Sequence, residues 1–396
     1  MSNRLIELQV YHLRLPFKHS FSHAAAQRAE TETILVAALL ADGTIGFGEG
    51  VPRTYVTGET IESVLYNISD TFAVALGQVE PKSFPELLDL IDNLPFTNQQ
   101  NQIINSARSA VELALLDAYA RYYQCSLSSI AGWLGCGFFT GDASIHKIRV
   151  SGVLDGADPD RMMKQLRLMR WYGLKDFKLK VGYGHDIENL NRINQKYHKA
   201  LSYGKMSLRV DANGAWDIDA AVAMSEKLAG LNVCCLEQPL APNDISHYRT
   251  IADLSRIPLM ADESLLTVDD AEYLAENDLV DYFNIRISKN GGIVPAIKIA
   301  EIAHKYGKNM QLGAMVGESA VLAAAGRQFL QMTPNVEFTE ICYSTFLLQN
   351  DIAERNIRFG YGGKLPKIGP LGLGLEIPRK KFSAFLVEPP RKISLA

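Results

Sequence analysis

The stretch SLRVDANG, residues 207–214, decides the fold, because it is a short apolar strand that ends on a carboxylate, Asp211. From about residue 146 such strands alternate with helical patterns, for example near residues 158–172 and 186–202. Repeated strand–helix units predict a parallel sheet, and eight of them close into a (β/α)8 TIM-type barrel. The strands are expected within IRVSGVL (148–154), DFKLKVG (176–182), SLRVDANG, CCLEQP (234–239), PLMADES (258–264), DYFNIRIS (281–288), NMQLGAMVGES (309–319) and NVEFTEIC (335–342).

The first third of the chain has a different pattern, typical of an α+β unit. LIELQVYHLRL (5–15) and ETILVAALLADGTIGFGEG (32–50) resemble antiparallel strands, with a turn at Asp42-Gly43. Helical patterns follow, the last of them at residues 101–124. The tail GPLGLGLEIPRKKF (369–382) is rich in Gly and Pro, and we expect it to return towards the first domain. We therefore predict an α+β domain at 1–135, a barrel at 136–365 and a returning segment at 366–396.

Composition excludes several classes of partner. The 396 residues carry a net charge of −4 and no basic run, which argues against nucleic acid or a membrane surface as a partner. No apolar stretch approaches the ~18 residues of a spanning helix, and the N-terminus has no signal-peptide pattern. The five cysteines show no CxxC spacing, which fits a reducing compartment. The expected location is therefore cytoplasmic.

Charged residues end four successive strands of the predicted barrel. Asp211, Glu237, Asp262 and Arg286 are 26, 25 and 24 residues apart, about one strand–helix unit each. Barrel active sites form where the loops after the strands converge. Three converging carboxylates need a cation, and oxygen ligands favour Mg²⁺ first and Mn²⁺ second. The alternative is that the three acids are unrelated and cap helices.

Two lysines stand one unit earlier. Lys178 and Lys180 share one face of DFKLKVG, while the apolar residues take the face that packs against the outer helices. Both lysines are therefore expected to point inward. Mutual repulsion and a nearby cation favour a neutral lysine, which could act as a base near pH 7. The alternative is a solvated pair at the strand end.

Together these residues suggest chemistry on a carboxylic acid. A divalent cation on the carboxylate oxygens would stabilise the enediolate that forms when a base removes the α-proton. At this point the sequence resembles the enolase superfamily, and within it the muconate lactonizing enzyme subgroup, over nearly its whole length. The resemblance rests on KxK (178–180), the three strand-end acids, EQP (237–239), DES (262–264) and ISKNGG (287–292).

The resemblance implies a modified barrel with an α+β capping domain. It implies that Lys180 is the base and that Lys178 helps to hold the substrate carboxylate. It further implies that Mg²⁺ is bound by Asp211, Glu237 and Asp262. A small-molecule carboxylate is then the expected substrate, and barrels of this family often assemble into homo-oligomers.

The sequence departs from the subgroup at one position. The sixth strand of the subgroup carries Asp, four residues, Lys, four residues and Gly-Gly, and here Arg286 takes the place of the lysine. Lys289 is expected to face outward or lie in the loop. Arginine is a poor proton shuttle, so a two-base racemase is doubtful and a fixed electrostatic role is favoured. The alternative is a structural pair between Arg286 and a neighbouring acid.

Further candidates for substrate contact lie at strand ends and in two segments expected to be loops, 16–26 and 48–60. We expect the loops to cover the barrel mouth, as in the resembled family. The DxD of the dipeptide epimerases is absent from TEIC (339–342), so the sequence does not support a dipeptide substrate. The candidates are His19, Phe21, His23, Arg53, Tyr55, Asn213, Glu318 and Glu340.

The predicted function is Mg²⁺-dependent abstraction of the α-proton of a carboxylate through an enediolate. The outcome would be isomerisation (by a cycloisomerase, racemase or epimerase) or dehydration. Two alternatives stay open at this stage. One is a Mg²⁺-dependent barrel lyase or aldolase that cleaves C–C bonds, and the other is an inactive binding protein with the same fold.

Overall fold

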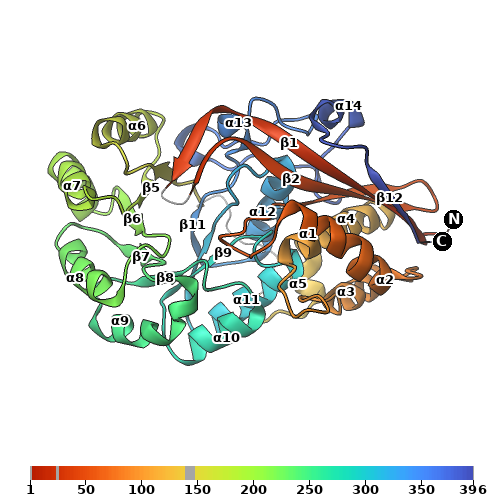
Figure 1. Ribbon diagram of the computed structural model, residues 1–396, viewed down its shortest axis with the longest axis horizontal. Coiled ribbons are helices and arrows are strands. Elements are labelled where there is room, and N and C mark those ends of the chain that lie inside the picture. The colour runs from red at the N-terminus through yellow and green to blue at the C-terminus, as the bar shows by residue number, and fades with distance from the viewer. Residues whose placement is uncertain (1, 24–25, 139–147, 396) are drawn as a thin grey trace.

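The computed structural model describes residues 2–23, 26–138 and 148–395, with side chains for all of these except 19–23 and 26–28. Two sheets organise the chain, an antiparallel sheet of four strands and a parallel sheet of eight (Figure 1). In the described part of the chain, no helix is both long and apolar enough to span a membrane.

The antiparallel sheet has the strand order β12-β1-β2-β3. Its strands are β1 (Leu5–His23), β2 (Ala26–Leu40), β3 (Ile45–Gly50) and β12 (Arg391–Ser394). The helices of this domain lie between β3 and the barrel in sequence, and they are α1 (Ile61–Asn67), α2 (Ala73–Leu76), α3 (Phe84–Asp92), α4 (Asn105–Tyr122) and α5 (Ile130–Trp133). Sheet and helices together form the capping domain.

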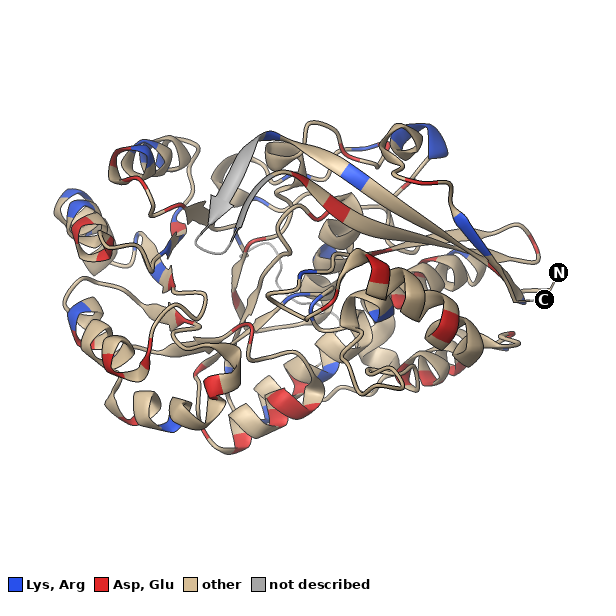
Figure 2. Ribbon diagram, in the orientation of Figure 1, with Lys and Arg blue, Asp and Glu red and all other residues tan. Residues whose placement is uncertain are grey.

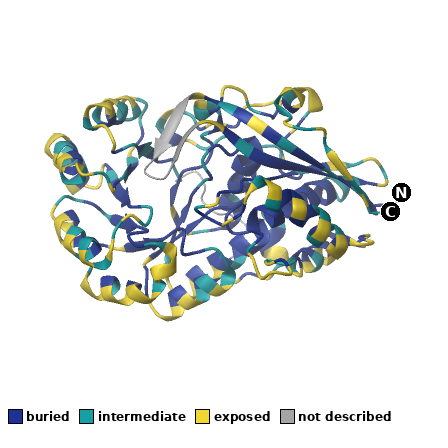
Figure 3. Cartoon of the chain, viewed as in Figure 1, coloured by how far each residue is buried: buried dark blue, intermediate teal, exposed yellow. Residues whose placement is uncertain are grey.

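Helix α4 lies against β3 because three glycines of IGFGEG leave room for it. A Cβ atom on Gly46, Gly48 or Gly50 would lie 2.0–2.1 Å from backbone atoms of α4. Such a contact is impossible, so only glycine permits this close approach. Helix α4 is buried along most of its length, and its buried residues include the charged Arg108, Glu112 and Asp117 (Figure 3).

The parallel sheet has the order β11-β10-β9-β8-β7-β6-β5-β4, so neighbours in sequence are neighbours in space. A parallel bridge between Val150 and Thr339 joins its two edges and closes the barrel. The strands are β4 (Gly152–Leu154), β5 (Asp176–Lys180), β6 (Ser207–Asp211), β7 (Cys235–Glu237), β8 (Leu259–Ala261), β9 (Tyr282–Ile285), β10 (Asn309–Leu312) and β11 (Val336–Thr339). The predicted barrel with an α+β capping domain is confirmed.

Helices follow the barrel strands, and α6 to α10 have exposed outer faces, whereas α12 is buried along nearly its whole length (Figure 3). The first two begin and end within a residue of the predicted limits. The helices are α6 (Pro159–Trp171), α7 (Asp186–Ser202), α8 (Ile218–Ala229), α9 (Tyr248–Leu254), α10 (Val268–Glu276), α11 (Ile293–Lys305) and α12 (Ala320–Met332), and two short ones, α13 (Ser344–Leu347) and α14 (Arg379–Phe382), come later.

The prediction of a loop at 16–26 was wrong for most of its length. Strand β1 continues to His23 and pairs with β2 as far as the register Phe21–Arg28 and His23–Ala26. The physical reason is the alternation of PFKHSFSH, which buries Phe17 on one face of the hairpin. Residues 48–50 of the second expected loop likewise belong to β3.

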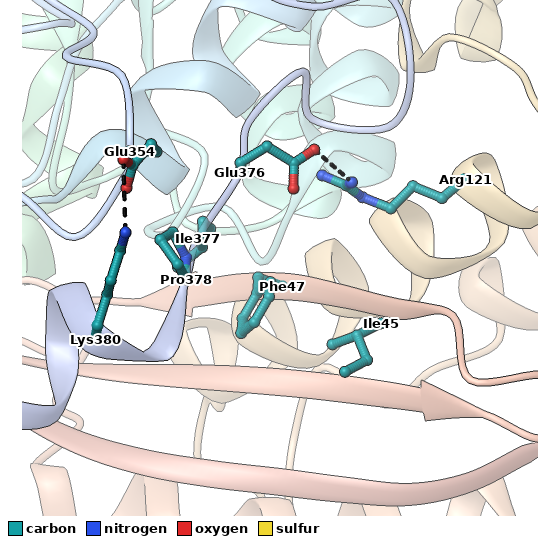
Figure 4. A pocket seen from close by; sticks show the side chains of 8 residues that line it. All are labelled: Ile45, Phe47, Arg121, Glu354, Glu376, Ile377, Pro378 and Lys380. Carbon is teal, nitrogen blue, oxygen red and sulfur yellow. Dashed lines mark hydrogen bonds and ion pairs between the residues drawn. The ribbon is translucent and has the colours of Figure 1, made fainter.

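The end of the chain lies on the capping sheet, because β12 pairs antiparallel with β1. A cavity of about 340 Å³ opens between β3, α4 and the segment before α14 (Figure 4). Its charged residues pair with one another, Arg121 with Glu376 at 3.1 Å and Lys380 with Glu354 at 3.9 Å. The cavity lies outside the barrel and contains none of the predicted site residues. The limits 1–135, 136–365 and 366–396 stay a prediction.

Candidate active site

The predicted site residues lie at the carboxyl ends of the barrel strands. Lys180 is in register with Asp211, and Asp211 with Glu237, across β5, β6 and β7. Residues in register on parallel strands face the same side of a sheet, so all three point into the barrel. Figure 2 shows acidic and basic segments close together at the ends of these strands. The strand alternation therefore placed both lysines on the inner face, as predicted.

Lys178 is surrounded by carboxylates. Its Nζ lies 2.7 Å from Glu340 Oε2, 3.0 Å from Glu237 Oε1 and 3.5 Å from Asp211 Oδ2. Burial alone would lower the pKa of Lys178, but Glu237, Glu340 and Asp211 outweigh burial and raise it. Lys178 therefore stays charged near neutral pH, which suits a residue that holds an anion.

Lys180 lies closer to the barrel mouth. Its side chain is 15% exposed, against 4% for Lys178, so it is the lysine that a ligand can reach. Its Nζ donates to Asn213 Oδ1 at 2.6 Å and lies 3.5 Å from Asp211 Oδ2. Asn213, a predicted substrate contact, therefore lies at the barrel mouth beside Lys180.

The three acids offered as metal ligands are fully buried. Burial would raise the pKa of Asp211, but Lys180, Lys178 and Arg286 lower it to about 2, so this carboxyl is ionised. Burial raises the pKa of Glu237 despite Lys178. Asp211 Oδ2 lies 3.5 Å from the amines of both Lys178 and Lys180, and Asp262 Oδ2 pairs with the guanidinium of Arg286.

The three acids are chemically suited to a divalent cation, since buried carboxylates at successive strand ends need positive charge. In the residues that the structure describes, no three His, Cys, Asp or Glu side chains lie close enough to share a metal ion. Side-chain cations lie against the acids, with Lys178 on Glu237 and Arg286 on Asp262. The donors are therefore suited to a metal ion, and protein cations balance their charge in this structure.

Arg286 points inward, and its guanidinium pairs with Asp262 Oδ2 and lies 3.8 Å from Glu263 Oε1. Its position beside a barrel acid is what the structural alternative predicted. Glu263, which the sequence reasoning did not single out, is buried. Its pKa is raised to about 7 by burial and by the nearby Asp211. Glu263 is the second residue of the DES motif (262–264), so the sequence already contained a second acid beside Asp262.

Lys289 lies in the loop after β9, which was one of the two predicted placements, but its side chain does not face outward. Strand β9 ends at Ile285, and residues 287–291 form a turn that folds the chain back. Lys289 is completely buried, and its Nζ lies 2.6 Å from the Asp262 carbonyl, 3.1 Å from Asp262 Oδ1 and 2.8 Å from the Asn284 carbonyl. It lies behind Asp262, so it does not replace the missing lysine.

Ser288 also leaves the face it would occupy in a continued strand. Its Oγ accepts a hydrogen bond from the Val51 N–H of the capping domain at 2.9 Å. Asn105, at the start of α4, donates to the Lys289 carbonyl at 2.7 Å, and Arg108 donates to the Gly291 carbonyl at 2.7 Å. The ISKNGG stretch is therefore both a barrel loop and the seam between the two domains.

Glu340 points into the barrel and bridges two cations. One oxygen meets Lys178 and the other accepts from Arg209 NH2 at 3.1 Å. Lys178 and Arg209 lower the pKa of Glu340 against the effect of burial, which is the largest influence. Arg209 is fully buried and stacks on the Phe338 ring at 3.8 Å. Arg209 and Asp211 are two residues apart on β6, so strand alternation could have predicted that Arg209 also points inward.

Amide side chains complete the inner wall. Asn284 Nδ2 donates to Glu237 Oε1 at 2.7 Å, and Gln311 Nε2 donates to Glu237 Oε2 at 3.3 Å. Sequence reasoning did not offer either as a site residue, although alternation had placed Asn284 on the face of Arg286. Strand register puts Gln311 opposite Asn284, which is why both reach the same carboxylate.

Glu318 follows β10 and is 7% exposed. Its Oε2 accepts from the Met315 N–H at 3.0 Å, and its Oε1 is buried without a hydrogen bond among the described residues. Burial, reinforced by Glu49, raises the pKa of Glu318 well above its usual value. These surroundings favour the protonated form of the carboxyl, which suits a group that donates a proton.

The remaining candidates for substrate contact belong to the capping domain. Arg53 is 3% exposed and donates to the Val316 carbonyl at 2.8 Å and to Thr31 Oγ1 at 2.6 Å, so it ties the capping domain to the loop before Glu318. Tyr55 is half-buried in the turn after β3. The side chains of His19, Phe21 and His23 lie outside the described residues, and their substrate contacts stay predictions.

Comparison with known proteins supports the resemblance to the enolase superfamily that the motifs indicate. The mandelate racemase/muconate lactonizing enzyme N-terminal domain profile matches residues 5–132, and the enolase C-terminal domain-like profile matches residues 161–381. An N-succinyl-L-Arg/Lys racemase of Bacillus cereus is 28% identical over 327 residues, 82% of this chain and 83% of that protein. Muconate cycloisomerase 1-2 of Acinetobacter lwoffii is 29% identical over 359 residues, 88% of this chain and 86% of that protein.

A solved structure extends the likeness to three dimensions. The N-succinyl Arg/Lys racemase from Bacillus cereus superposes with a TM-score of 0.83 at 26% identity, covering 98% of this chain and 99% of that one. Two family profiles, the curated relatives and this superposition agree with the resemblance seen in the motifs. The chain therefore belongs to the mandelate racemase/muconate lactonizing enzyme family of the enolase superfamily.

Proposed function

We propose that the protein abstracts the α-proton of a small-molecule carboxylate with Lys180 as the base, in a Mg²⁺-dependent isomerisation. The observation that carries the proposal is the register of Lys180 with Asp211 and Glu237, which brings a reachable lysine beside buried acids. Named relatives include a racemase and a cycloisomerase, so isomerisation is favoured over C–C bond cleavage. Family membership does not support the lyase or the inactive alternative.

Asp211, Glu237 and Asp262 would hold the divalent cation. When bound, it would supply positive charge for the substrate carboxylate as the α-proton leaves. Lys178 would add a permanent positive charge beside that carboxylate, since three acids keep it protonated. Asn284 and Gln311 fix Glu237 from the opposite side.

Lys180 would take the proton, giving an enediolate. Asn213 accepts a hydrogen bond from its Nζ and so holds the amine at the barrel mouth. Glu318, whose protonated form is favoured by burial, is suited to return a proton at another position of the substrate. Arg286 cannot serve as a second base, because a guanidinium stays protonated in proteins. It would stabilise negative charge on the substrate instead.

The test is isotope exchange in D₂O with Mg²⁺. The enzyme would be incubated with pooled N-succinyl and other N-acyl amino acids, hydroxy acids, acid sugars and betaines, and masses would be read. We expect one of these acids to gain one deuterium at its α-carbon or to be converted to an isomer. Lys180→Ala should lower the rate by about 10²–10⁴, the usual contribution of a general base.

Lys196→Ala is the matched control, because Lys196 is exposed on the outer helix α7. It should leave exchange at the wild-type rate. If Lys180→Ala turns over as fast as Lys196→Ala on the same substrate, Lys180 is not the base and the proposal fails.

A further inference from the structure

Asp262 lies between two protein cations that hold different atoms of it. Lys289 meets Oδ1 and the backbone carbonyl, whereas the guanidinium of Arg286 lies against Oδ2. Both cations come from the segment after β9, three residues apart, yet they approach the carboxylate differently because the chain turns between them. The two oxygens of Asp262 are therefore not equivalent.

Lys289 is built into the wall of the barrel. Its side chain is 0% exposed, and its three nearest acceptors are the Asp262 carbonyl, Asp262 Oδ1 and the Asn284 carbonyl. Burial and the nearby Arg286 lower the pKa of Lys289, but three acceptors within hydrogen-bond distance require three donors, so the amine is an ammonium here. Because Asp262 follows β8 and Asn284 lies on β9, the ammonium also joins two neighbouring strands.

Among the described residues, the guanidinium of Arg286 uses fewer of its donors than the ammonium of Lys289 does. Its side chain is 11% exposed, and its guanidinium pairs with Asp262 Oδ2 and lies 3.8 Å from Glu263 Oε1. A guanidinium has five donors in a planar fork, and the ion pairs found among the described residues involve its NH2 atom alone. A ligand can therefore replace Arg286 at Oδ2 without breaking the barrel wall.

We propose that Lys289 is a positioning residue for metal binding. It fixes Oδ1 of Asp262 from behind and presents Oδ2 to the cation, while Arg286 is the partner that the cation displaces from Oδ2. This inference rests on the proposed function, because it requires Asp262 to be a metal ligand. Hydrogen bonds that orient ligands commonly contribute 10- to 100-fold to metal affinity.

The experiment is calorimetric titration of the full chain with MgCl₂ alone, after removal of metal with EDTA. Lys289→Met and Arg286→Met each remove one positive charge in contact with Asp262, so their electrostatic effects on a bound cation are similar. Lys305→Met, on the outer surface beside Glu272, is the control for loss of a lysine elsewhere. It should bind as the wild type does.

We expect Lys289→Met to raise the Kd for Mg²⁺ by 10- to 100-fold, and Arg286→Met to leave it unchanged or lower it. If both variants bind Mg²⁺ more tightly, charge alone decides and the positioning role is overturned. An unchanged Kd in Lys289→Met also overturns the positioning role. A similar loss of Mg²⁺ affinity in both variants would overturn the assignment of different roles to Lys289 at Oδ1 and Arg286 at Oδ2.

Because Lys289 is buried, Lys289→Gln is the second variant if Lys289→Met does not give folded protein. Its amide keeps two donors, so the loss in affinity should have the same sign and be smaller. Failure of the wild type to bind Mg²⁺ would overturn both this inference and the proposed metal. Wild-type binding with an unaltered Lys289→Gln would overturn the inference and leave the proposed function intact.

Discussion

Glu49 of the capping domain caps a helix of the barrel at Ser319. Its Oε2 accepts from Ser319 Oγ at 2.7 Å and from the Leu322 N–H at 3.2 Å, and its Oε1 accepts from the Ser319 N–H at 3.0 Å. Thr33 adds a hydrogen bond at 2.9 Å. The first turn of α12 thus depends on a carboxylate from another domain.

Replacing Glu49 with alanine should therefore destabilise the protein. The change leaves buried N–H groups at the start of α12 without acceptors, which costs about 1–3 kcal/mol each in the general case. Urea unfolding should show a fall in the free energy of unfolding of at least that size. Glu30→Ala, in an exposed pair with Arg14, is the control and should change little. Equal effects of the two variants would contradict the capping role.

Gly292→Ala should destabilise the seam between the domains. Gly292 has φ of +129°, and a Cβ there would lie 2.3 Å from the Glu112 carboxyl carbon, which is buried. Strain and overlap together should cost about 2–5 kcal/mol. The matched control is Gly307→Ala, at φ +66° with open space around it, which isolates the backbone strain of about 1–2 kcal/mol. Equal losses in urea unfolding would show that the contact with Glu112 is unimportant.

Glu263 should make stability fall with rising pH in metal-free protein. Burial raises its pKa from 4.5 to about 7, so the folded state keeps a proton that the unfolded chain releases. Its contribution is complete below about pH 4.5 and is lost as the pH rises through about 7, by roughly 3 kcal/mol at most.

The measurement is urea unfolding in EDTA at pH 5 and pH 8. Glu263→Gln removes the titrating group, so the variant should gain stability relative to the wild type between these two pH values. The prediction is wrong if the difference in free energy of unfolding between variant and wild type is the same at both.

Arg286→Lys should change the stereochemistry of the reaction. A lysine at this position can exchange a proton, whereas a guanidinium cannot, so the variant gains a second base. We expect the wild type to exchange the α-proton of one enantiomer, and the variant to racemise the same acid at least about tenfold faster, roughly 1.4 kcal/mol in barrier. Chiral chromatography of the exchanged acid in D₂O measures this.

Arg192→Lys, on the outer face of α7, is the control for the substitution itself. It should exchange and racemise as the wild type does. Strictly one-sided exchange in Arg286→Lys would show that the position does not lie on the second face of the α-carbon.

The sequence by itself determined the barrel and the inner faces of its strands. Alternation in DFKLKVG and SLRVDANG requires Lys178, Lys180 and Asp211 to point the same way, because a strand has a period of two residues. The equal spacing of the acids then brings them to one end of the barrel. These conclusions depend only on local geometry, which a sequence encodes directly.

Only the tertiary structure decided what lies beyond the strand ends. The period of two fails once β9 ends, so Lys289 turns back onto Asp262 and Ser288 reaches Val51 of the other domain. The pairing of Arg209 with Glu340 joins β6 to the end of β11, distant in sequence, and only barrel closure brings them together. Turns and contacts between distant segments are set by packing, which no local pattern specifies.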